Sequence, residues 1–192
     1  MNLIIIRHGK ASHNLGSEKQ HTFAGSQIDN DLSKEGIENA HFLASELKDV
    51  KIDKIFTSPL IRSKQTTKII VDDLGKDIPV DEDKNLTEIN IGDFAGHTED
   101  EVKNLYPESA KAFYGEEIEN WDFPNGENYG QVSERIDRLI GKIKKEVKPN
   151  QTILLSGHGM INRVLFYKLV KDRADLWKER SYSHNKIVNI DL

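Results

Sequence analysis

The feature that most constrains this chain is a pattern that occurs three times along it. A short apolar run is followed by polar residues and then by a segment with helical spacing. The apolar runs are Leu3–Ile6, Ile52–Thr57 and Thr152–Leu155. Runs of this length are typical of strands that are buried on both faces. Alternation of such strands with helices predicts an α/β three-layer sandwich, in which helices cover both faces of a mostly parallel central sheet.

Apolar residues at helical spacing predict the helices between these strands. Ser33 is the expected N-cap of the first helix, and Ser58 followed by Pro59 predicts the start of the second, which ends near Gly75. The apolar positions of the first and of the longest helix are Ile37, Ala40, Ala44 and Leu47, and Val132, Ile136, Leu139, Ile140, Ile143 and Val147.

The remaining segments are interpreted from their turn formers and caps. Lys10–Asn30 is polar and has no periodicity, so we expect a long loop, and Leu86–Gly96 predicts a second one. Thr98 and Glu101 form a capping box for a short helix. We expect two further short strands, one at Ile78–Val80 and an edge strand at Ile187–Ile190.

Composition limits the possible functions. The net charge of −5 does not favour a broad basic face for nucleic acid. The opening apolar run is too short for a signal peptide or a membrane span, so a cytoplasmic location without a membrane partner is the default expectation. Cysteine is absent, which excludes disulfides and thiol chemistry.

One segment differs from the rest of the chain. Between Glu99 and Glu127 nine acidic residues stand against two lysines, a local charge of −7, and six of the fourteen aromatic residues lie between Tyr106 and Tyr129. With 192 residues, 36% hydrophobic residues and no internal repeat, we expect a single domain over 1–192 with this acidic insert at about 97–130, near the active site. The aromatic residues are expected to pack within the insert, and one or two to touch substrate.

The three strands formed by the apolar runs all deliver polar residues to the edge of the sheet where ligands bind. These residues are Arg7 and His8, Ser58 with Arg62, and Ser156 with His158. Arginine presents a fork of donors that matches phosphate oxygens, and helix N-termini add further N–H groups. A neutral histidine in such a pocket can attack phosphorus. The convergence predicts a site for a compact dianion, and a phosphoryl group fits it better than a carboxylate.

The same residues belong to motifs that resemble those of the histidine phosphatase superfamily, also called phosphoglycerate mutase-like. The motifs occur in the family order over nearly the whole chain. They are Arg7-His8-Gly9, Asn14, Phe23-Ala24-Gly25 with Asp29, Leu32-Ser33 and Gly36, Thr57-Ser58-Pro59-Leu60-Ile61-Arg62-Ser63-Lys64-Gln65-Thr66, Leu86-Thr87-Glu88 with Gly92 and Gly96, and Ser156-Gly157-His158-Gly159.

The resemblance implies a role for each matching residue. His8 would be the nucleophile that becomes phosphohistidine, and Glu88 would donate a proton to the leaving alcohol and then assist the attacking water. The phosphoryl oxygens would be held by Arg7, Arg62 and His158 with help from Asn14, and the substrate site would include Gly25, Ser58 and Gly159. No metal and no cofactor are implied, because the arginines take the place of a divalent cation.

The chain departs from the family pattern at the expected rim of the pocket. Lys10-Ala11 replaces the usual Glu-Ser after R-H-G, His13 replaces an aromatic residue, and Gly126-Glu127-Asn128 replaces Gly-Glu-Ser. These departures leave the substrate open. We assign no role to His13, His21, His41, His97 or His184, although His21 lies in the long loop and could line the pocket. A metal site at His8 and His158 is a weaker alternative, because neither lies in a ligand spacing such as H-E-x-x-H.

Three functions remain open. The first is a metal-independent phosphomonoesterase, the second a cofactor-dependent phosphoglycerate mutase, and the third a phospholigand-binding module without catalysis. The mutase pattern E-x-x-Y-G is replaced by Glu88-Ile89-Asn90-Ile91-Gly92, and the retained acid argues against the binding module. The expected partners are a small phosphorylated metabolite and inorganic phosphate as product, and a homodimer remains open. If the insert covers the pocket, its charge should disfavour multiply phosphorylated substrates and favour a monophosphate with a neutral or cationic leaving group.

Overall fold

Five strands form one sheet in the computed structural model, which describes residues 1–14, 21–115, 117–173, 175, 178 and 183–191. Their order across the sheet is β3-β2-β4-β1-β5. β5 pairs antiparallel with β1 at the edge, and all other pairs are parallel. The strands are β1 (Asn2–Arg7), β2 (Lys54–Thr57), β3 (Val80–Glu82), β4 (Thr152–Gly157) and β5 (Ile187–Asp191). The predicted α/β class and edge strand are confirmed.

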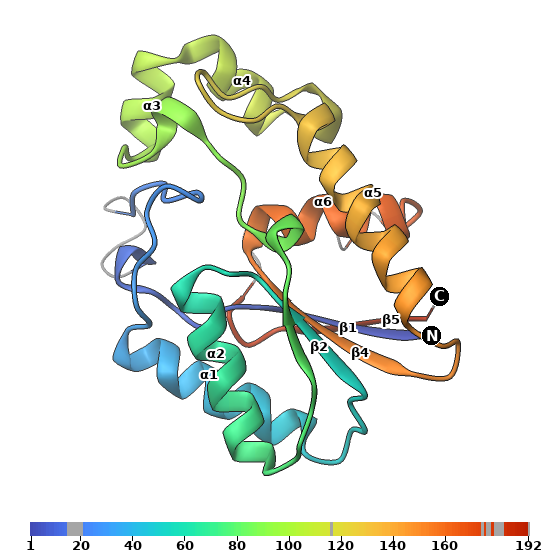
Figure 1. The fold of residues 1–192 in the computed structure, drawn as a ribbon. Coiled ribbons are helices and arrows are strands. Elements are labelled where there is room, and N and C mark those ends of the chain that lie inside the picture. The colour runs from blue at the N-terminus through green and yellow to red at the C-terminus, as the bar shows by residue number, and fades with distance from the viewer. Residues whose placement is uncertain (15–20, 116, 174, 176–177, 179–182, 192) are drawn as a thin grey trace.

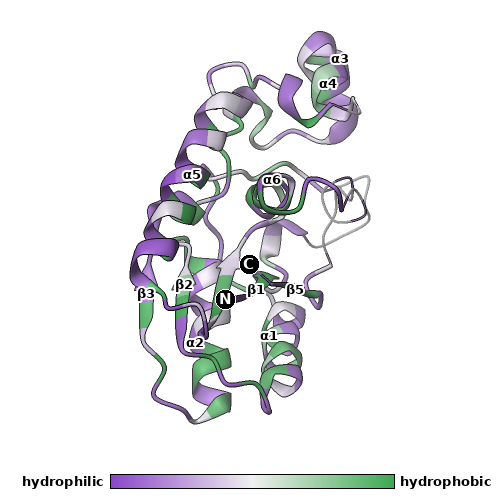
Figure 2. Cartoon of the chain, turned by 90° about the vertical axis from the view of Figure 1, so that its right-hand side faces the viewer, coloured by the Kyte–Doolittle hydropathy of each residue, from purple (hydrophilic) through white to green (hydrophobic). Residues whose placement is uncertain are grey.

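Helices lie on both faces of this sheet, which confirms the predicted three layers. α1 and α2 cover one face and α5 and α6 the other (Figure 1). α3 and α4 lie at the end of the molecule furthest from α1 and α2 (Figure 2). No helix within the described ranges combines the length and the apolar character that a membrane span needs. The helices are α1 (Lys34–Leu47), α2 (Ile61–Leu74), α3 (Glu99–Leu105), α4 (Pro107–Tyr114), α5 (Tyr129–Glu146) and α6 (Gly159–Leu169).

The first strand shows why its sequence is continuously apolar. Successive side chains of a strand point to opposite faces, so Leu3 and Ile5 pack on the α5–α6 side while Ile4 and Ile6 pack on the α1–α2 side. All four are buried. Burying a polar side chain without a partner is costly, and the polar residues of β1 accordingly stand only at its two ends, Asn2 and Arg7.

Most predicted helix ends are confirmed. Ser33 caps α1 by accepting a hydrogen bond from the Gly36 N–H at 3.1 Å. The capping box of Thr98 and Glu101 is present at α3. The longest helix, α5, begins earlier than its first apolar residue, because Asn128 and the residue three positions on form a second capping box.

Three local predictions are wrong. Ser58 is not the N-cap of α2, which begins at Ile61, because the Ser58 hydroxyl contacts a histidine instead. The third strand lies at Val80–Glu82 rather than at Ile78–Val80. The side chain of Ile37 is 42% exposed, and Leu43 takes its place in the core of this face.

The insert contains more helix than the sequence indicated. α4 follows α3 directly, with Pro107 at its first turn, where a proline costs no hydrogen bond. The aromatic residues of the insert pack around Phe94, whose ring centroid lies 5.1 Å from that of Phe123 and 5.7 Å from that of Tyr106. This packing matches the expectation that most of the aromatic residues stabilise the insert.

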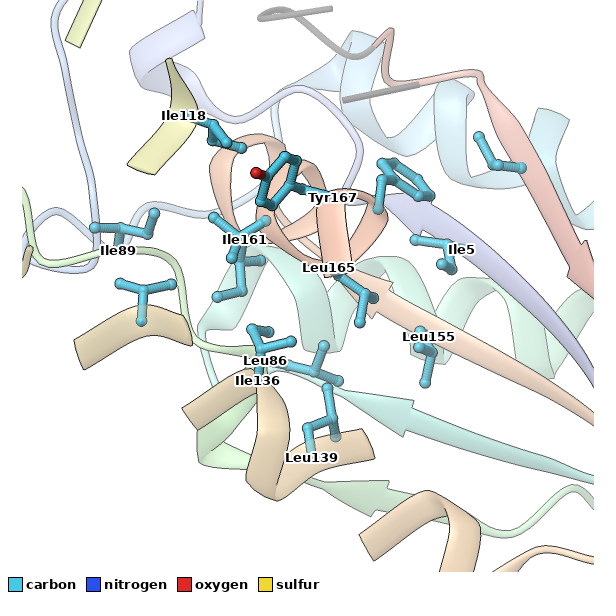
Figure 3. Packing of buried hydrophobic residues seen from close by; sticks show 14 of the residues in the cluster. Ile5, Leu86, Ile89, Ile118, Ile136, Leu139, Leu155, Ile161, Leu165 and Tyr167 are labelled. Carbon is cyan, nitrogen blue, oxygen red and sulfur yellow. The ribbon is translucent and has the colours of Figure 1, made fainter. Parts of the chain in front are cut away.

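The hydrophobic core on the α5–α6 side extends from the sheet into the insert. Figure 3 shows Ile118 of the insert above Tyr167 of α6, with Leu155 of β4 deeper in the same cluster. The Tyr167 hydroxyl donates a hydrogen bond to Glu119 at 2.5 Å. The insert is therefore anchored to α6, the helix that begins at the predicted active site.

Candidate active site

The three strands that were predicted to deliver polar residues are neighbours in the sheet. β4 lies between β2 and β1, with Arg7 paired to Gly157 and Thr57 paired to Ser156. The hydrogen bonding continues one residue beyond the strand ends. The His8 N–H donates to the Gly157 carbonyl at 3.1 Å, and the Ser58 N–H donates to that of Ser156 at 3.0 Å. These bonds fix the backbone at the mouth of the site.

The His8 imidazole is held as one tautomer. Its Nδ1 lies 2.7 Å from the carbonyl oxygen of Gly9, which can only accept, so Nδ1 carries the proton. Its Nε2 lies 3.2 Å from the Nε of Arg62, which can only donate. The Nε2 atom therefore presents a lone pair to the arginine side of the site. This is the nitrogen that a nucleophilic histidine needs.

The surroundings also keep this imidazole neutral. Burial lowers the pKa of His8 well below its usual 6.5, and the neighbouring His158, Arg7 and Arg62 act in the same direction. The ring centroid of His158 lies 4.9 Å from that of His8. A histidine that stays unprotonated at neutral pH is available for attack without first losing a proton.

Arg62 is fixed before any ligand arrives. Its side chain is 1% exposed. One terminal nitrogen donates to the carbonyl of Ile28 at 3.0 Å and to the carboxylate of Asp29 at 3.3 Å, and the other donates to the carbonyl of Gly25 at 2.9 Å. Burial lowers the pKa of Arg62, while Glu88 and Asp29 oppose that shift. The guanidinium is thus oriented by the loop that precedes α1.

Arg7 supplies the second cation. Burial lowers its pKa to about 10, with Glu88 raising it and Arg62 lowering it. Arginine at that pKa remains charged at neutral pH. A Cβ added at Gly159 would lie 3.5 Å from the Arg7 guanidinium carbon, so the glycine leaves the first turn of α6 directly against the cation. Arg7 and the N-terminus of α6 therefore face the same space.

His158 is oriented from behind by Ser58. The Ser58 Oγ accepts the Leu60 N–H at 3.3 Å and lies 2.7 Å from His158 Nε2. In the tautomer in which the Ser58 hydroxyl donates to Nε2, His158 carries its proton on Nδ1, an atom that is buried without a hydrogen-bond partner among the described residues. Burial, with Arg62 and Arg7, lowers the pKa of His158 well below 6.5. The pair therefore presents one unused N–H donor beside His8.

Glu88 is bound to the start of α6. Its two carboxylate oxygens accept hydrogen bonds from the N–H groups of Met160 at 3.2 Å and Ile161 at 3.0 Å, and from its own neighbour Ile89 at 3.0 Å. The N-terminus of a helix stabilises a negative charge. Glu88 thus lies at the N-terminal end of α6.

A cavity of about 190 Å³ collects these groups. Its lining combines the cations Arg7 and Arg62 with the apolar side chains of Phe23, Ile91 and Phe113; we call the first group the cationic end and the second the apolar end. Its lining residues are Arg7, His8, His13, Asn14, Thr22, Phe23, Ala24, Gly25, Arg62, Glu88, Ile91, Phe113, Gly159 and Met160. Seven of the nine predicted site residues are among them, and Phe113 brings one aromatic residue of the insert into contact with the cavity.

The two other predicted site residues lie behind this surface. His158 contacts the His8 ring, and Ser58 lies behind His158 with its side chain fully buried. Ser156, which the strand-end argument also named, contacts Ser63 of α2 rather than the cavity. Gly9 is approached closely by the backbone of Gly36: a Cβ at Gly9 would lie 2.2 Å from the Gly36 oxygen.

Two histidines that were given no role lie beside His8. His13 lines the cavity, with its ring centroid 6.4 Å from that of His8, and burial lowers its pKa to about 4. His184 donates from Nδ1 to the His8 carbonyl at 2.5 Å, and burial lowers its pKa to about 3. In the sequence, only the position of His13 in the long loop and that of His184 before the last strand could have indicated that the two side chains lie beside His8. His21, which could have lined the cavity, is not among the lining residues.

The departures from the family pattern have local explanations. Lys10 forms an ion pair with Glu35 at 2.6 Å and does not line the cavity. Asn128 stands where the family has serine, and both residue types cap helices well.

Within the described residues, no group of three or more histidine, aspartate or glutamate side chains could hold a metal ion.

Comparison with known proteins agrees with this geometry. The family model of the histidine phosphatase superfamily (branch 1) matches residues 3–191. The chain belongs to this superfamily. It is 29% identical over 176 residues to phosphoserine phosphatase 1 of Hydrogenobacter thermophilus, an alignment that covers 91% of this chain and 79% of that one.

Other relatives include mutases and phosphatases. The chain is 30% identical over 177 residues to the 2,3-bisphosphoglycerate-dependent phosphoglycerate mutase of Bartonella tribocorum, with 87% of this chain and 80% of the relative covered. The crystal structure of the α-ribazole phosphatase from Shigella flexneri superposes with a TM-score of 0.81 at 25% identity, over 100% of this chain and 91% of that one. This member of the superfamily is therefore an enzyme of the phosphatase or phosphoglycerate mutase type, from a metal-independent family whose substrates are small phosphorylated molecules.

Proposed function

We propose that this protein is a phosphomonoesterase that hydrolyses small phosphate monoesters through a phosphohistidine on His8. The observation that carries the proposal is the state of the His8 ring. Its proton is held on Nδ1 by the Gly9 carbonyl, and its Nε2 lone pair lies 3.2 Å from Arg62 in a cavity that also holds Arg7. A phosphoryl oxygen that takes over the Arg62 donor would bring phosphorus to this lone pair.

In the first half-reaction, His8 Nε2 attacks phosphorus and the bond from phosphorus to the alcohol oxygen breaks. The electron pair of that bond goes to the leaving oxygen, which receives the proton of Glu88. Arg7 and Arg62 hold the equatorial oxygens as their charge grows. We propose that the Nδ1–H of His158, in the tautomer in which Ser58 donates to Nε2, supplies one more donor at this end of the site.

In the second half-reaction, water attacks phosphorus and the bond to His8 Nε2 breaks. The electron pair returns to the ring, Glu88 takes a proton from the water, and inorganic phosphate leaves. The same carboxyl group therefore acts first as an acid and then as a base.

Glu88 must change partners during this cycle. As a carboxylate it accepts hydrogen bonds from Met160 and Ile161 at the start of α6. A phosphate dianion is the stronger ligand for a helix N-terminus. Its arrival can take one of these N–H groups and leave Glu88 to hold the proton that the alcohol needs.

The cavity lining supports a monophosphate as substrate. The only arginine or lysine side chains in the described lining are Arg7 and Arg62, enough for one phosphoryl group. The alcohol would contact the apolar end, at Phe23, Ile91 and Phe113. None of the acidic side chains in the described part of the insert lines the cavity, so we expect the insert to act on polyanions through its long-range charge of −7.

A mutase reaction is the second candidate, and the mutase relatives favour it. It would use the same phosphohistidine and return the phosphoryl group to another hydroxyl of a phosphorylated acid. Such a substrate carries a carboxylate in addition to its phosphate groups. The two arginines of the described lining would then have to neutralise a larger negative charge than that of a simple phosphate monoester.

The test is a panel of phosphate esters assayed in the presence of a chelator. We expect release of inorganic phosphate from sugar and nucleoside monophosphates, slower turnover of inositol polyphosphates, and loss of all turnover in His8→Ala. Conversion of 3-phosphoglycerate faster than any hydrolysis would establish the mutase instead. Binding of phosphate esters without turnover by the wild type would establish a binding module.

A further inference from the structure

A partly buried ion pair lies outside the cavity and has no part in the reaction described above. Arg135 lies on the buried face of α5, at the spacing of Val132 and Leu139. Its Nε and a terminal nitrogen donate to the two carboxylate oxygens of Glu127, at 2.9 and 3.1 Å. Removing two charges from water offsets most of their attraction, so such a pair adds little net stability over an apolar pair of similar size. Stability alone therefore does not explain an arginine on this face.

The rest of the Arg135 guanidinium binds the loop that carries Glu88. Its other terminal nitrogen donates to the carbonyl of Asn85 at 2.8 Å and to that of Thr87 at 2.7 Å. These carbonyls lie immediately before Glu88 in the chain. The arginine thus holds the loop on the upstream side of the proposed acid.

Glu127 holds the same loop on the downstream side. One of its carboxylate oxygens accepts the Asn90 N–H at 2.8 Å, and the Glu127 N–H donates to the Asn90 carbonyl at 2.7 Å. A Cβ on the preceding residue, Gly126, would lie 2.5 Å from the same carbonyl, so this approach requires glycine. The pair therefore fixes the backbone on both sides of Glu88.

We infer that Arg135 and Glu127 are positioning residues that set the place of the Glu88 carboxyl group between the substrate and the start of α6. The inference rests on the proposed role of Glu88 as proton donor. Arg135→Lys keeps the positive charge but cannot make these four hydrogen bonds, because lysine lacks the planar fork. Glu127→Gln keeps the size of the side chain and removes its charge.

The expected effect depends on the leaving group. A displacement of a catalytic group by about 1 Å can lower a rate by about 100-fold, and a general acid contributes about 100-fold or more. A simple alkyl phosphate needs that proton, whereas p-nitrophenyl phosphate releases a stable phenolate and needs it little. The value of kcat/KM reports the steps up to release of the alcohol, so it isolates the step in which Glu88 is the acid.

The experiment measures kcat/KM for both esters in the wild type, Arg135→Lys, Glu127→Gln and the control Arg138→Lys. Arg138 lies on the same helix, and its exposed side chain pairs only weakly with Glu134 at 3.9 Å. We expect Arg135→Lys and Glu127→Gln to lower kcat/KM for the alkyl phosphate roughly 10- to 100-fold, and for p-nitrophenyl phosphate by less than about threefold. Arg138→Lys should change neither.

The same measurements in the Glu88→Gln background separate positioning from general damage. There, Arg135→Lys and Glu127→Gln should cause no further loss on the alkyl phosphate. Equal losses on both esters, or the full loss again in the Glu88→Gln background, would overturn the inference. If Glu88→Gln itself lowers both esters equally, the proton-donor role fails and the inference falls with it. If Glu88→Gln lowers kcat/KM more for the alkyl phosphate than for p-nitrophenyl phosphate, and neither Arg135→Lys nor Glu127→Gln does so, the proton-donor role stands and only the inference fails. Should Arg135→Lys not fold, Glu127→Gln decides.

Discussion

The two ends of the cavity are built in different ways. At the cationic end, Arg7 and His8 end a strand buried on both faces, and Arg62 is fixed by backbone carbonyls and Asp29. At the apolar end, Phe23, Ile91 and Phe113 come from loops and from the insert. The cationic end is set by the sheet itself, whereas the apolar end depends on a segment packed onto it. The difference indicates that the chemistry belongs to the common scaffold and that the choice of alcohol belongs to the insert.

The largest effect is expected at the cationic end. Arg62→Ala removes a fixed cation from the developing phosphoryl charge, and we expect kcat/KM to fall about 1,000-fold for every ester, as for the loss of a preorganised donor. The control is Lys64→Ala on the same helix, where the lysine is exposed and does not line this cavity. A loss of less than tenfold, or one that depends on the alcohol, would contradict the division between the two ends.

The next largest effect is on how the free energy of unfolding depends on pH, and it comes from His184 beside His8. The pKa of His184 is about 3 in the folded protein and about 6.5 in the unfolded chain, so only the unfolded chain gains a proton between these values. Its contribution to stability is complete above pH 6.5 and is lost as the pH falls toward 3. His184→Asn keeps a donor for the His8 carbonyl. Urea unfolding at pH 4 to 6 should therefore show a slope against pH smaller by about 1.4 kcal/mol per pH unit. An unchanged slope would contradict the buried neutral state of His184.

A smaller loss is expected when the support behind the cationic end is removed. Ser58→Ala leaves His158 Nε2 without the hydroxyl 2.7 Å away, so the ring no longer has one preferred tautomer. We expect kcat/KM to fall about tenfold, the effect of a modest change in hydrogen-bond energy. Nitrogen NMR of His158 should show the proton on Nδ1 in the wild type and a mixture of tautomers in the variant. If Ser58→Ala causes the same loss of kcat/KM in the His158→Gln background, Ser58 does not act through His158 and the prediction is contradicted.

The smallest effect is expected at the apolar end. Phe113→Leu reduces the insert's contribution to the cavity and should raise KM by about fivefold for esters of larger apolar alcohols, with little change for the smallest ones, because one or two lost methylene-sized contacts are worth about 1 kcal/mol. Phe42→Leu on α1, an exposed residue away from the cavity, is the control. A uniform fall in kcat for all esters would show that the insert also affects the chemistry.

The sequence predicted the cationic end better than the apolar one. Strand ends and motifs located Arg7, His8 and Arg62, because a buried parallel strand can change to polar residues only at its end. Ser58 was misinterpreted, since a serine before proline is equally compatible with a helix cap and with a contact to a residue 100 positions away. Periodicity reports which face of an element is buried, not which distant group it meets.

The support of Glu88 shows the same limit more clearly. The sequence placed α5 by its apolar residues, and Arg135 interrupts that face without any local signal of purpose. Its partners, Glu127 and the carbonyls of Asn85 and Thr87, come from two separate loops. α4 was likewise not predicted, because the order of the insert comes from aromatic packing around Phe94 rather than from amphipathic spacing. Long-range hydrogen bonds and packing of this kind appear only in the folded chain.

The most direct test of the account is to trap the phosphorylated enzyme. Wild-type protein mixed rapidly with a ³²P-labelled phosphomonoester and quenched in alkali should carry one label per chain on Nε2 of His8, and the label should be lost in acid. His158→Asn should still form it, more slowly, because the nucleophile remains. A wild type that turns over the ester without a trapped label, or a His8→Asn variant that still becomes labelled and active, would contradict the role of His8.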